Sequence, residues 1–212
     1  MNSGGAGRTA LIYGIAVAGD ALATGLMRRG WRVLVADDAP TEAKRALAAG
    51  LGTNLVEAPD TEALAELVAA VDIVCPAPGV PETHPVVAAA VAAGTPLRTE
   101  IDLAYEFEQQ RPGGPRPMLA ITGTDGKTTT TLLTAHILEA AGHRASAVGN
   151  TDVPLVAALD DDVDVFAVEC SSFRLNWLLS FRAEASVWLN LAPDHQNWHT
   201  SMAADAACKA RM

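Results

Sequence analysis

The chain has 212 residues, of which 50% are hydrophobic and only 5% are aromatic, and its formal net charge is −10. A chain of this size can bury one or two hydrophobic cores, and its abundant alanine, valine and leucine suit layered α/β structure better than an all-β sandwich. The negative charge argues against a protein that coats nucleic acid or anionic membranes.

The first half of the chain alternates short apolar runs with helical stretches. The expected strands are Ala10–Tyr13, Arg32–Ala36 and Asp72–Cys75, and the expected helices are Asp20–Arg29, 41–49, 61–70 and 85–93. Alternating units of this size predict a parallel sheet with right-handed crossovers. We therefore predict a Rossmann-like domain over residues 1–110.

A proline- and glycine-rich stretch at 111–117 cannot continue a helix or a strand and is interpreted as a domain linker. The second domain is predicted to cover 118–212. Its expected strands lie near 118–122, 145–148, 164–169 and 185–190, and its expected helices follow residue 126 and cover 201–211.

The apolar segment at 11–18 is similar to a signal peptide, since Ala16-Val17-Ala18 could form a cleavage site. Gly14 and Asp20 interrupt it, and a second strand-like run follows at the distance of a βαβ unit, so we expect no signal peptide. No apolar run reaches about 18 residues, the length that spans a bilayer. We predict a cytoplasmic protein without a membrane span.

Cysteine usage agrees with a reducing compartment. The three cysteines, Cys75, Cys170 and Cys208, are odd in number and lack the spacing of a metal site. We expect them to be buried as small hydrophobic side chains.

The stretch L-A-I-T-G-T-D-G-K-T-T-T-T at 119–131 is the most informative in the chain. A strand, a glycine-rich turn and a helix N-terminus form an anion site, because unpaired N–H groups and the helix dipole point to one place. Lysine adds a positive charge for phosphates, and a threonine hydroxyl can hold Mg²⁺. The predicted ATP-binding residues are Gly123, Thr124, Asp125, Gly126, Lys127, Thr128 and Thr129.

A second glycine pattern, Gly14 to Gly19, is a damaged G-x-G-x-x-G in which Ala16 replaces the middle glycine. Asp37 ends the second strand, where an acid would meet a ribose or a base. A nucleotide site and a purely structural turn remain open as explanations of this pattern.

Two further polar groups are expected beside the ATP-binding loop. Glu169 ends one strand and His195 follows another. Open α/β sheets bind ligands at the carboxyl ends of their strands, so both should approach Lys127. A carboxylate and an imidazole beside nucleotide phosphates are plausible Mg²⁺ ligands.

Several segments, in order along the chain, resemble the motifs of the Mur ligase family. They are G-T-D-G-K-T-T at 123–129, G-N-T-D-V-P at 149–154, E-C-S-S-F-R-L at 169–175, N-L-A-P-D-H at 190–195 and A-A-C-K-A-R at 206–211. The S-S-F after Glu169, with G-V-P-E-T-H-P at 79–85, is most similar to the members that add D-glutamate.

The resemblance implies an ATP-dependent amide ligase of peptidoglycan synthesis. ATP would phosphorylate the alanyl carboxylate of UDP-N-acetylmuramoyl-L-alanine, and the amine of D-glutamate would attack the acyl phosphate. Lys127 would hold the β- and γ-phosphates, Thr128 and Glu169 a first Mg²⁺, and His195 a second. Lys209 falls on a lysine that the family carbamylates, which turns a cation into an oxygen ligand for Mg²⁺.

The resemblance also implies where the UDP-linked substrate binds. Asn150 and Ser171 would contact its muramoyl part or diphosphate. The first-domain residues expected around UDP are Val17, Ala18, Asp37, Asp38, Ala77, Pro78 and Gly79. The expected ligands are thus ATP, Mg²⁺, the UDP-linked substrate and D-glutamate, without nucleic acid, and we expect a monomer.

The chain is short for this family. The resemblance implies that the rest of the ATPase domain and a C-terminal domain, with most D-glutamate contacts, lie outside these 212 residues. We expect a truncated P-loop ATPase-type α/β domain and a fragment that does not turn over by itself.

Some positions depart from the family pattern. Asp125 replaces an asparagine, Arg174 a glutamine and Ala77 a serine, whereas Asn197 and Asp205 stand where an aspartate and an aromatic residue are expected. One hypothesis is that Arg174 offsets the charge of Asp125, by pairing with it or by binding the substrate diphosphate. The alternative is that both side chains point into solvent.

Other functions fit parts of the sequence. A nicotinamide-dependent oxidoreductase would use Gly14 to Gly19 and Asp37, but it leaves Gly126-Lys127-Thr128 unexplained. A non-catalytic nucleotide-binding relative, an alanine-adding Mur ligase and a folylpolyglutamate synthase remain open, although Phe173 favours the D-glutamate-adding members.

Overall fold

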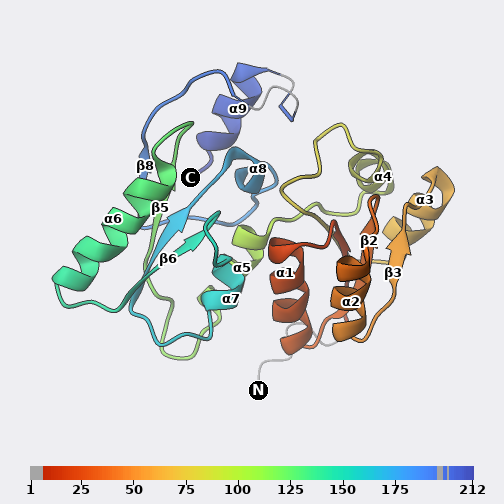
Figure 1. Cartoon of the computed structure of the whole chain (residues 1–212), viewed down its shortest axis with the longest axis horizontal. Helices are drawn as coiled ribbons and strands as arrows, with labels where there is room; N and C mark the ends of the chain where they lie inside the picture. The colour runs from red at the N-terminus through yellow and green to blue at the C-terminus, as the bar shows by residue number, and fades with distance from the viewer. Residues whose placement is uncertain (1–6, 195–197, 200) are drawn as a thin grey trace. The chain divides into compact units, whose positions relative to one another are not determined.

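The structure, a computed structural model, describes residues 7–194, 198–199 and 201–212. The chain forms two compact units, Met1–Arg98 and Thr99–Met212. Each unit has its own four-stranded sheet with helices around it (Figure 1). Every strand pair is parallel, so the α/β fold class expected from the sequence is confirmed.

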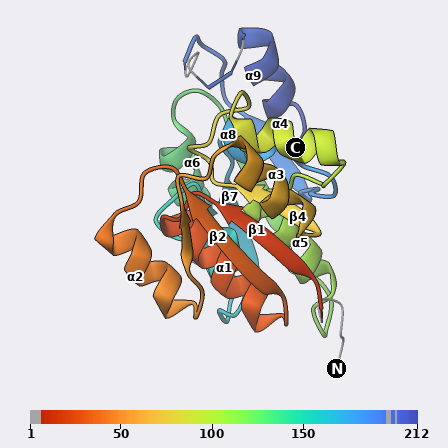
Figure 2. The ribbon, with the colours of Figure 1, turned by 90° about the vertical axis from the view of Figure 1, so that its right-hand side faces the viewer.

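Unit 1 alternates strands and helices along the chain. Its elements are β1 (Thr9–Tyr13), α1 (Val17–Arg28), β2 (Arg32–Asp37), α2 (Glu42–Gly50), β3 (Leu55–Glu57), α3 (Thr61–Ala69), β4 (Ile73–Pro76) and α4 (Pro85–Ala93). The strand order is β3-β2-β1-β4, and Figure 2 shows β1 and β2 side by side. Ala10, Leu11 and Ile12 of the central strand β1 are fully buried, as expected for a parallel strand.

Unit 2 begins with a helix and continues with a second parallel sheet. Its elements are α5 (Glu100–Gln109), β5 (Met118–Thr122), α6 (Lys127–Ala140), β6 (Ala145–Gly149), α7 (Leu155–Ala158), β7 (Val165–Glu169), α8 (Ser172–Leu175), β8 (Ala185–Trp188) and α9 (Met202–Lys209). The strand order β6-β7-β5-β8 places β5 and β7 at the centre. The carboxyl ends of β5 and β7 therefore lie next to each other.

The division between the units falls before α5, twelve residues earlier than the predicted end of the first domain at 110. Three acidic side chains of α5, those of Glu100, Asp102 and Glu108, are buried, with partners in unit 2. Asp102 Oδ1 accepts the N–H groups of Ser180 and Phe181 at 2.8 and 2.7 Å, and Glu108 Oε2 pairs with Arg116 at 2.8 Å. The stretch 111–117, predicted to be a linker, is thus anchored within unit 2 through Arg116.

Several short elements were absent from the prediction. The strand β3 and the helices α7 and α8 contain only three or four residues each, too few to establish a period. Helix α1 begins at Val17 rather than at the expected Asp20. In the described ranges, no helix combines the length and the apolarity needed to cross a bilayer.

Candidate active site

The loop that joins β5 to α6, residues 123–126, is named the phosphate loop after its predicted ligand. It depends on two glycines with positive φ. Gly123 has φ 154° and Gly126, the N-cap of α6, has φ 82°. A Cβ at Gly123 would lie 3.1 Å from the Cβ of Leu189. Gly126 provides no side-chain cap, so the first N–H groups of α6 remain available to a ligand.

The side chain of Asn190 holds the phosphate loop through hydrogen bonds. Its Oδ1 accepts the N–H groups of Thr124 and Asp125 at 3.0 and 2.9 Å, and its Nδ2 donates to the Asp125 carbonyl at 3.0 Å. The Thr124 hydroxyl exchanges hydrogen bonds with the backbone of Ala192 at 2.9 and 3.2 Å. The sequence placed Asn190 at a strand end but did not reveal this role.

The ammonium group of Lys127 lies over the same loop. Its Nζ donates to the carbonyl oxygens of Gly123 and Thr124 at 2.8 and 2.7 Å. A cavity of about 360 Å³ opens here, and Thr128, Thr129 and Glu169 are among the residues that line it. Six of the seven residues predicted to bind ATP, Thr124 to Thr129, therefore line one cavity, and Gly123 lines a smaller one.

Glu169, at the end of β7, has the features of a cation ligand. The residue is 1% exposed, and its Oε1 accepts a hydrogen bond from Asn150 Nδ2 at 3.0 Å. Its Oε2 is buried and has no hydrogen-bond partner in the described part of the chain. A buried carboxylate oxygen without a partner fits Mg²⁺, which prefers oxygen ligands. Thr128 offers a second oxygen in the same cavity.

A smaller cavity of about 90 Å³ adjoins the phosphate loop, and its walls include Ser171, Phe173 and Lys209. Ser171 Oγ is buried without a hydrogen-bond partner among the described residues, so it could accept a substrate group. Lys209 Nζ donates to Asp205 Oδ2 at 2.6 Å and to Thr124 Oγ1 at 3.3 Å. His195, predicted to hold a second Mg²⁺, and Asn197 lie outside the described residues.

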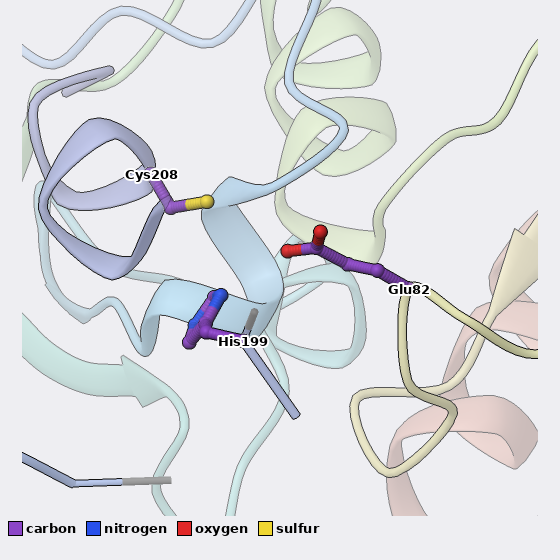
Figure 3. A group of neighbouring side chains, drawn as sticks. All are labelled: Glu82, His199 and Cys208. Atoms are coloured by element: carbon purple, nitrogen blue, oxygen red, sulfur yellow. The ribbon is translucent and has the colours of Figure 1, made fainter. Parts of the chain in front are cut away.

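His199 and Cys208, labelled in Figure 3, belong to unit 2, whereas Glu82 in the same picture belongs to unit 1. His199 Nε2 lies 2.8 Å from Ser172 Oγ, and Cys208 Sγ lies 3.1 Å from Asn176 Oδ1. All three cysteines are buried, as expected. Burial raises the pKa of the Cys75 and Cys170 thiols to about 12, so both stay protonated near neutral pH.

In unit 1, the carboxylate oxygens of Asp37 accept hydrogen bonds from other groups of the protein. Its Oδ2 accepts the Ile15 N–H at 3.0 Å, and its Oδ1 accepts from Ala39 N at 2.9 Å and Lys44 Nζ at 2.7 Å. Burial alone would raise the pKa of this carboxyl, but these donors, led by Lys44, lower it overall. Asp37 therefore joins the turn after β1 to the end of β2.

Asp38, the next residue, is exposed and belongs to a polar cluster that the sequence did not reveal. It accepts hydrogen bonds from Tyr13 Oη at 2.5 Å and from His84 Nε2 at 2.7 Å. His84 Nδ1 accepts the Val86 N–H at 3.2 Å and so caps α4. Because Nδ1 is an acceptor, Nε2 carries the proton. The sequence signal that could have revealed this cluster is His84, the histidine in G-V-P-E-T-H-P.

The other first-domain residues expected around UDP also follow the carboxyl ends of strands in unit 1. Val17 is exposed at the start of α1, and Ala77, Pro78 and Gly79 follow β4. Gly14 adopts φ 90°, and a Cβ there would lie 2.9 Å from the Cβ of Ala77. Packing thus requires a glycine at position 14, which supports the structural explanation of the Gly14 to Gly19 pattern.

Arg174 does not pair with Asp125, so the pairing form of that hypothesis is wrong. Arg174 is 6% exposed, and its Nη1 pairs with the buried Glu100 Oε2 at 2.6 Å. The other Glu100 oxygen accepts the Val156 N–H at 2.6 Å. Asp125 is exposed, as the alternative expected, but Arg174 is not. The sequence missed this pair because Glu100 precedes Arg174 by 74 residues.

Comparison with known proteins agrees with this geometry. Residues 121–212 match the family described as Mur ligase middle domain. The chain is 42% identical over 206 residues to UDP-N-acetylmuramoylalanine--D-glutamate ligase of Mycolicibacterium vanbaalenii, over 97% of this chain and 42% of that relative. It is 41% identical over 217 residues to the ligase of the same name from Streptomyces coelicolor, over 100% of this chain and 45% of that relative. The chain thus spans less than half the length of these relatives.

A solved structure shows the same fold. The crystal structure of UDP-N-acetylmuramate:L-alanyl-gamma-D-glutamyl-meso-diaminopimelate ligase from Neisseria meningitides aligns with a TM-score of 0.56 and 19% identity. The alignment covers 95% of this chain and 66% of that protein. Together with the sequence matches, this means that the chain belongs to the Mur ligase family.

Proposed function

We propose that the chain supplies the UDP-binding and ATP-binding parts of a ligase that joins D-glutamate to UDP-N-acetylmuramoyl-L-alanine in peptidoglycan synthesis. The observation that carries this proposal is the cavity shared by the phosphate loop, Lys127 and the buried Glu169. The relatives named D-glutamate ligases give further support. The reaction would take place in the cytoplasm, where ATP is available.

In this proposal the phosphate loop and Lys127 bind the β- and γ-phosphates of ATP. Lys127 would exchange its bonds to the loop carbonyls for charge-assisted bonds to phosphate oxygens. Thr128 and Glu169 would hold Mg²⁺, which supplies positive charge to the phosphates when bound. Asn150 would orient the Glu169 carboxylate, and Ser171 would contact the UDP-linked substrate.

The UDP group would bind in unit 1 at the carboxyl ends of β1, β2 and β4. Asp38, Ala77 and Gly79 would contact it directly, whereas Asp37 would act through the shape of the turn after β1. The site for D-glutamate would lie largely in the part of the relatives that this chain does not match.

Calorimetry with Mg-ATP tests the ATP site. Lys127→Ala should weaken binding to the 212-residue chain roughly tenfold to hundredfold, because a charge-assisted contact contributes about 1.5–3 kcal/mol. Arg32→Ala removes an exposed cation from unit 1 and should leave the affinity unchanged. If Lys127→Ala binds Mg-ATP as tightly as the unmodified chain and the Arg32→Ala control, the loop is structural.

Substitution of Gly79 tests the UDP site. A Cβ at Gly79 meets no atom within 4 Å, so Gly79→Val should fold normally yet weaken binding of UDP-N-acetylmuramoyl-L-alanine. Gly50→Val, at the open end of α2, is the matched control. Unchanged affinity in a folded Gly79→Val variant would exclude this edge of the sheet.

A further inference from the structure

The helix α5 carries two buried ion pairs, one near each of its ends. Glu100 Oε2 pairs with Arg174 Nη1 at 2.6 Å, and Glu108 Oε2 pairs with Arg116 Nη2 at 2.8 Å. All four residues are at most 6% exposed. The two glutamates lie about 12 Å apart along the helix axis, at 1.5 Å per residue. The two pairs therefore hold different parts of unit 2.

The Glu108–Arg116 pair lies away from the candidate site. Arg116 precedes β5, and its guanidinium donates to the carbonyl oxygens of Leu159 and Asp161 at 2.7 and 2.8 Å. Both of these residues precede β7, and β5 and β7 are parallel. This pair thus belongs to the amino ends of the two strands, whereas Glu169 and the cavity beside it lie at the carboxyl ends.

The Glu100 carboxylate, in contrast, joins two segments that follow the carboxyl ends of strands. Its Oε1 accepts the Val156 N–H of α7 at 2.6 Å, and its Oε2 binds Arg174 of α8. The segment between β6 and α7 contains Asn150, whose side chain donates to Glu169 at 3.0 Å. One carboxylate therefore connects α8 with the segment that orients Glu169.

The position of α8 depends on such contacts. The helix contains only four residues, and a helix of this length is not stable by itself. Its N-cap is Ser171, whose hydroxyl is buried in the wall of the smaller cavity without a partner among the described residues. A charge-assisted hydrogen bond fixes the distance and direction between its partners. The bond from Arg174 to Glu100 thus fixes the helix that begins at Ser171.

We propose that Glu100 and Arg174 are positioning residues of the candidate site, which fix Ser171 and the segment that carries Asn150. The described residues that line the two cavities do not include Arg174, so it acts through α8 and not by contact with the substrate diphosphate. The inference rests on the proposed function for the ligand that Ser171 contacts. Its first test needs no ligand.

Hydrogen exchange of the 212-residue chain, measured by mass spectrometry, tests whether the pair holds α8. Arg174→Met removes the cation beside the site, and Arg116→Met makes the same change at the other end of α5 as the matched control. We expect the amides of residues 172–175 to exchange at least about tenfold faster in Arg174→Met, because α8 then opens locally. Arg116→Met should leave their rates unchanged. Protection of α8 that persists in Arg174→Met, or that is lost equally in Arg116→Met, would overturn the proposal.

Calorimetry with UDP-N-acetylmuramoyl-L-alanine separates positioning from stability. Adding Glu100→Gln to Arg174→Met removes the unpaired buried charge and so restores part of the free energy of unfolding, but it does not restore the ion pair. We expect the affinity to stay roughly fivefold low in both variants, the effect of one hydrogen bond to Ser171. Arg116→Met should bind as the unmodified chain does. An affinity that recovers together with the stability, or that falls equally in Arg116→Met, would mean that the pair only stabilises unit 2.

The two experiments keep this proposal distinct from the proposed function. An unmodified chain that does not bind the UDP-linked substrate would contradict the proposed function, and the exchange of α8 would still decide whether the pair positions Ser171. If Arg174→Met does not fold, the double variant with Glu100→Gln leaves no buried charge unpaired and allows the same comparisons. Unchanged affinity in variants whose α8 exchanges faster would also overturn the proposal.

Discussion

The side-chain amide of Asn190 pairs with the backbone of Asp125 as a neighbouring strand would. Asn190 Oδ1 accepts the Asp125 N–H at 2.9 Å, and Nδ2 donates to the Asp125 carbonyl at 3.0 Å. The loop is therefore held at this residue through its main chain, while the Asp125 side chain is exposed. This explains how an aspartate can replace asparagine at this position without loss of the loop conformation.

Replacement of Asn190 should disorder the phosphate loop. Asn190→Ala removes three hydrogen bonds from the side chain to the loop, each worth about 1 kcal/mol. We expect Mg-ATP affinity, measured by calorimetry, to fall at least about tenfold. Asn54→Ala changes an exposed asparagine in unit 1 and should have no effect. Retained affinity in Asn190→Ala would show that the loop is held by its glycines alone.

Removal of the Glu169 charge should make the affinity for ATP independent of Mg²⁺. Glu169→Gln keeps the size of the side chain but replaces a carboxylate oxygen, so the cation loses a charged ligand. Calorimetric titrations with ATP, with and without Mg²⁺, should then give similar affinities. Glu139→Gln, on the exposed face of α6, should keep the response to Mg²⁺. A Glu169→Gln variant that keeps it too would rule out this carboxylate as a ligand.

The contribution of Asp37 to stability should depend on pH. The folded-state pKa of its carboxyl lies below the ordinary value of 3.8, because Lys44 and two backbone donors outweigh the effect of burial. A carboxyl with a lowered folded pKa adds stability above its unfolded pKa, and loses it as the pH falls through the folded value. Asp37→Asn should therefore lower the free energy of unfolding by roughly 1–3 kcal/mol at neutral pH.

The difference between Asp37→Asn and the unmodified chain should begin to shrink below about pH 4, where Asp37 of the unfolded chain takes up a proton. It should be lost once the pH falls below the folded pKa, because both side chains are then neutral. Urea unfolding across this range measures it. Glu66→Gln, at an exposed position of α3, should show no such convergence. A difference that stays constant down to pH 2 would mean that the Asp37 charge adds nothing to stability.

Loss of the Arg174 guanidinium should destabilise unit 2. Arg174→Met leaves the buried Glu100 carboxylate without its cation, at a cost of about 3–5 kcal/mol in the free energy of unfolding. Adding Glu100→Gln should recover part of this loss. Asp125→Asn should change stability by less than about 0.5 kcal/mol, and its effect should add to that of Arg174→Met. Coupling between residues 125 and 174 in urea unfolding would contradict the structure.

The sequence predicted most of the fold and the position of the phosphate loop. Strand–turn–helix order and Gly126-Lys127-Thr128 located the phosphate loop, because local spacing alone determines that conformation. Glu169 was placed correctly at a strand end for the same reason, since parallel strands bring their carboxyl ends to one edge. The unit boundary was less accurate, because Pro and Gly at 111–117 mark a turn whether or not the chain around it is packed.

The order of the apolar runs, the turn glycines and the phosphate loop could be determined from the sequence by itself, since each depends on neighbours within a few residues. Only the tertiary structure decided which polar and charged groups pair. Glu100 with Arg174, Asp38 with Tyr13 and His84, and Asn190 with Asp125 join residues 25 to 74 positions apart. A buried charge is stabilised by whichever partner the folded chain brings within hydrogen-bond distance, and the residues beside it in the sequence do not reveal that partner.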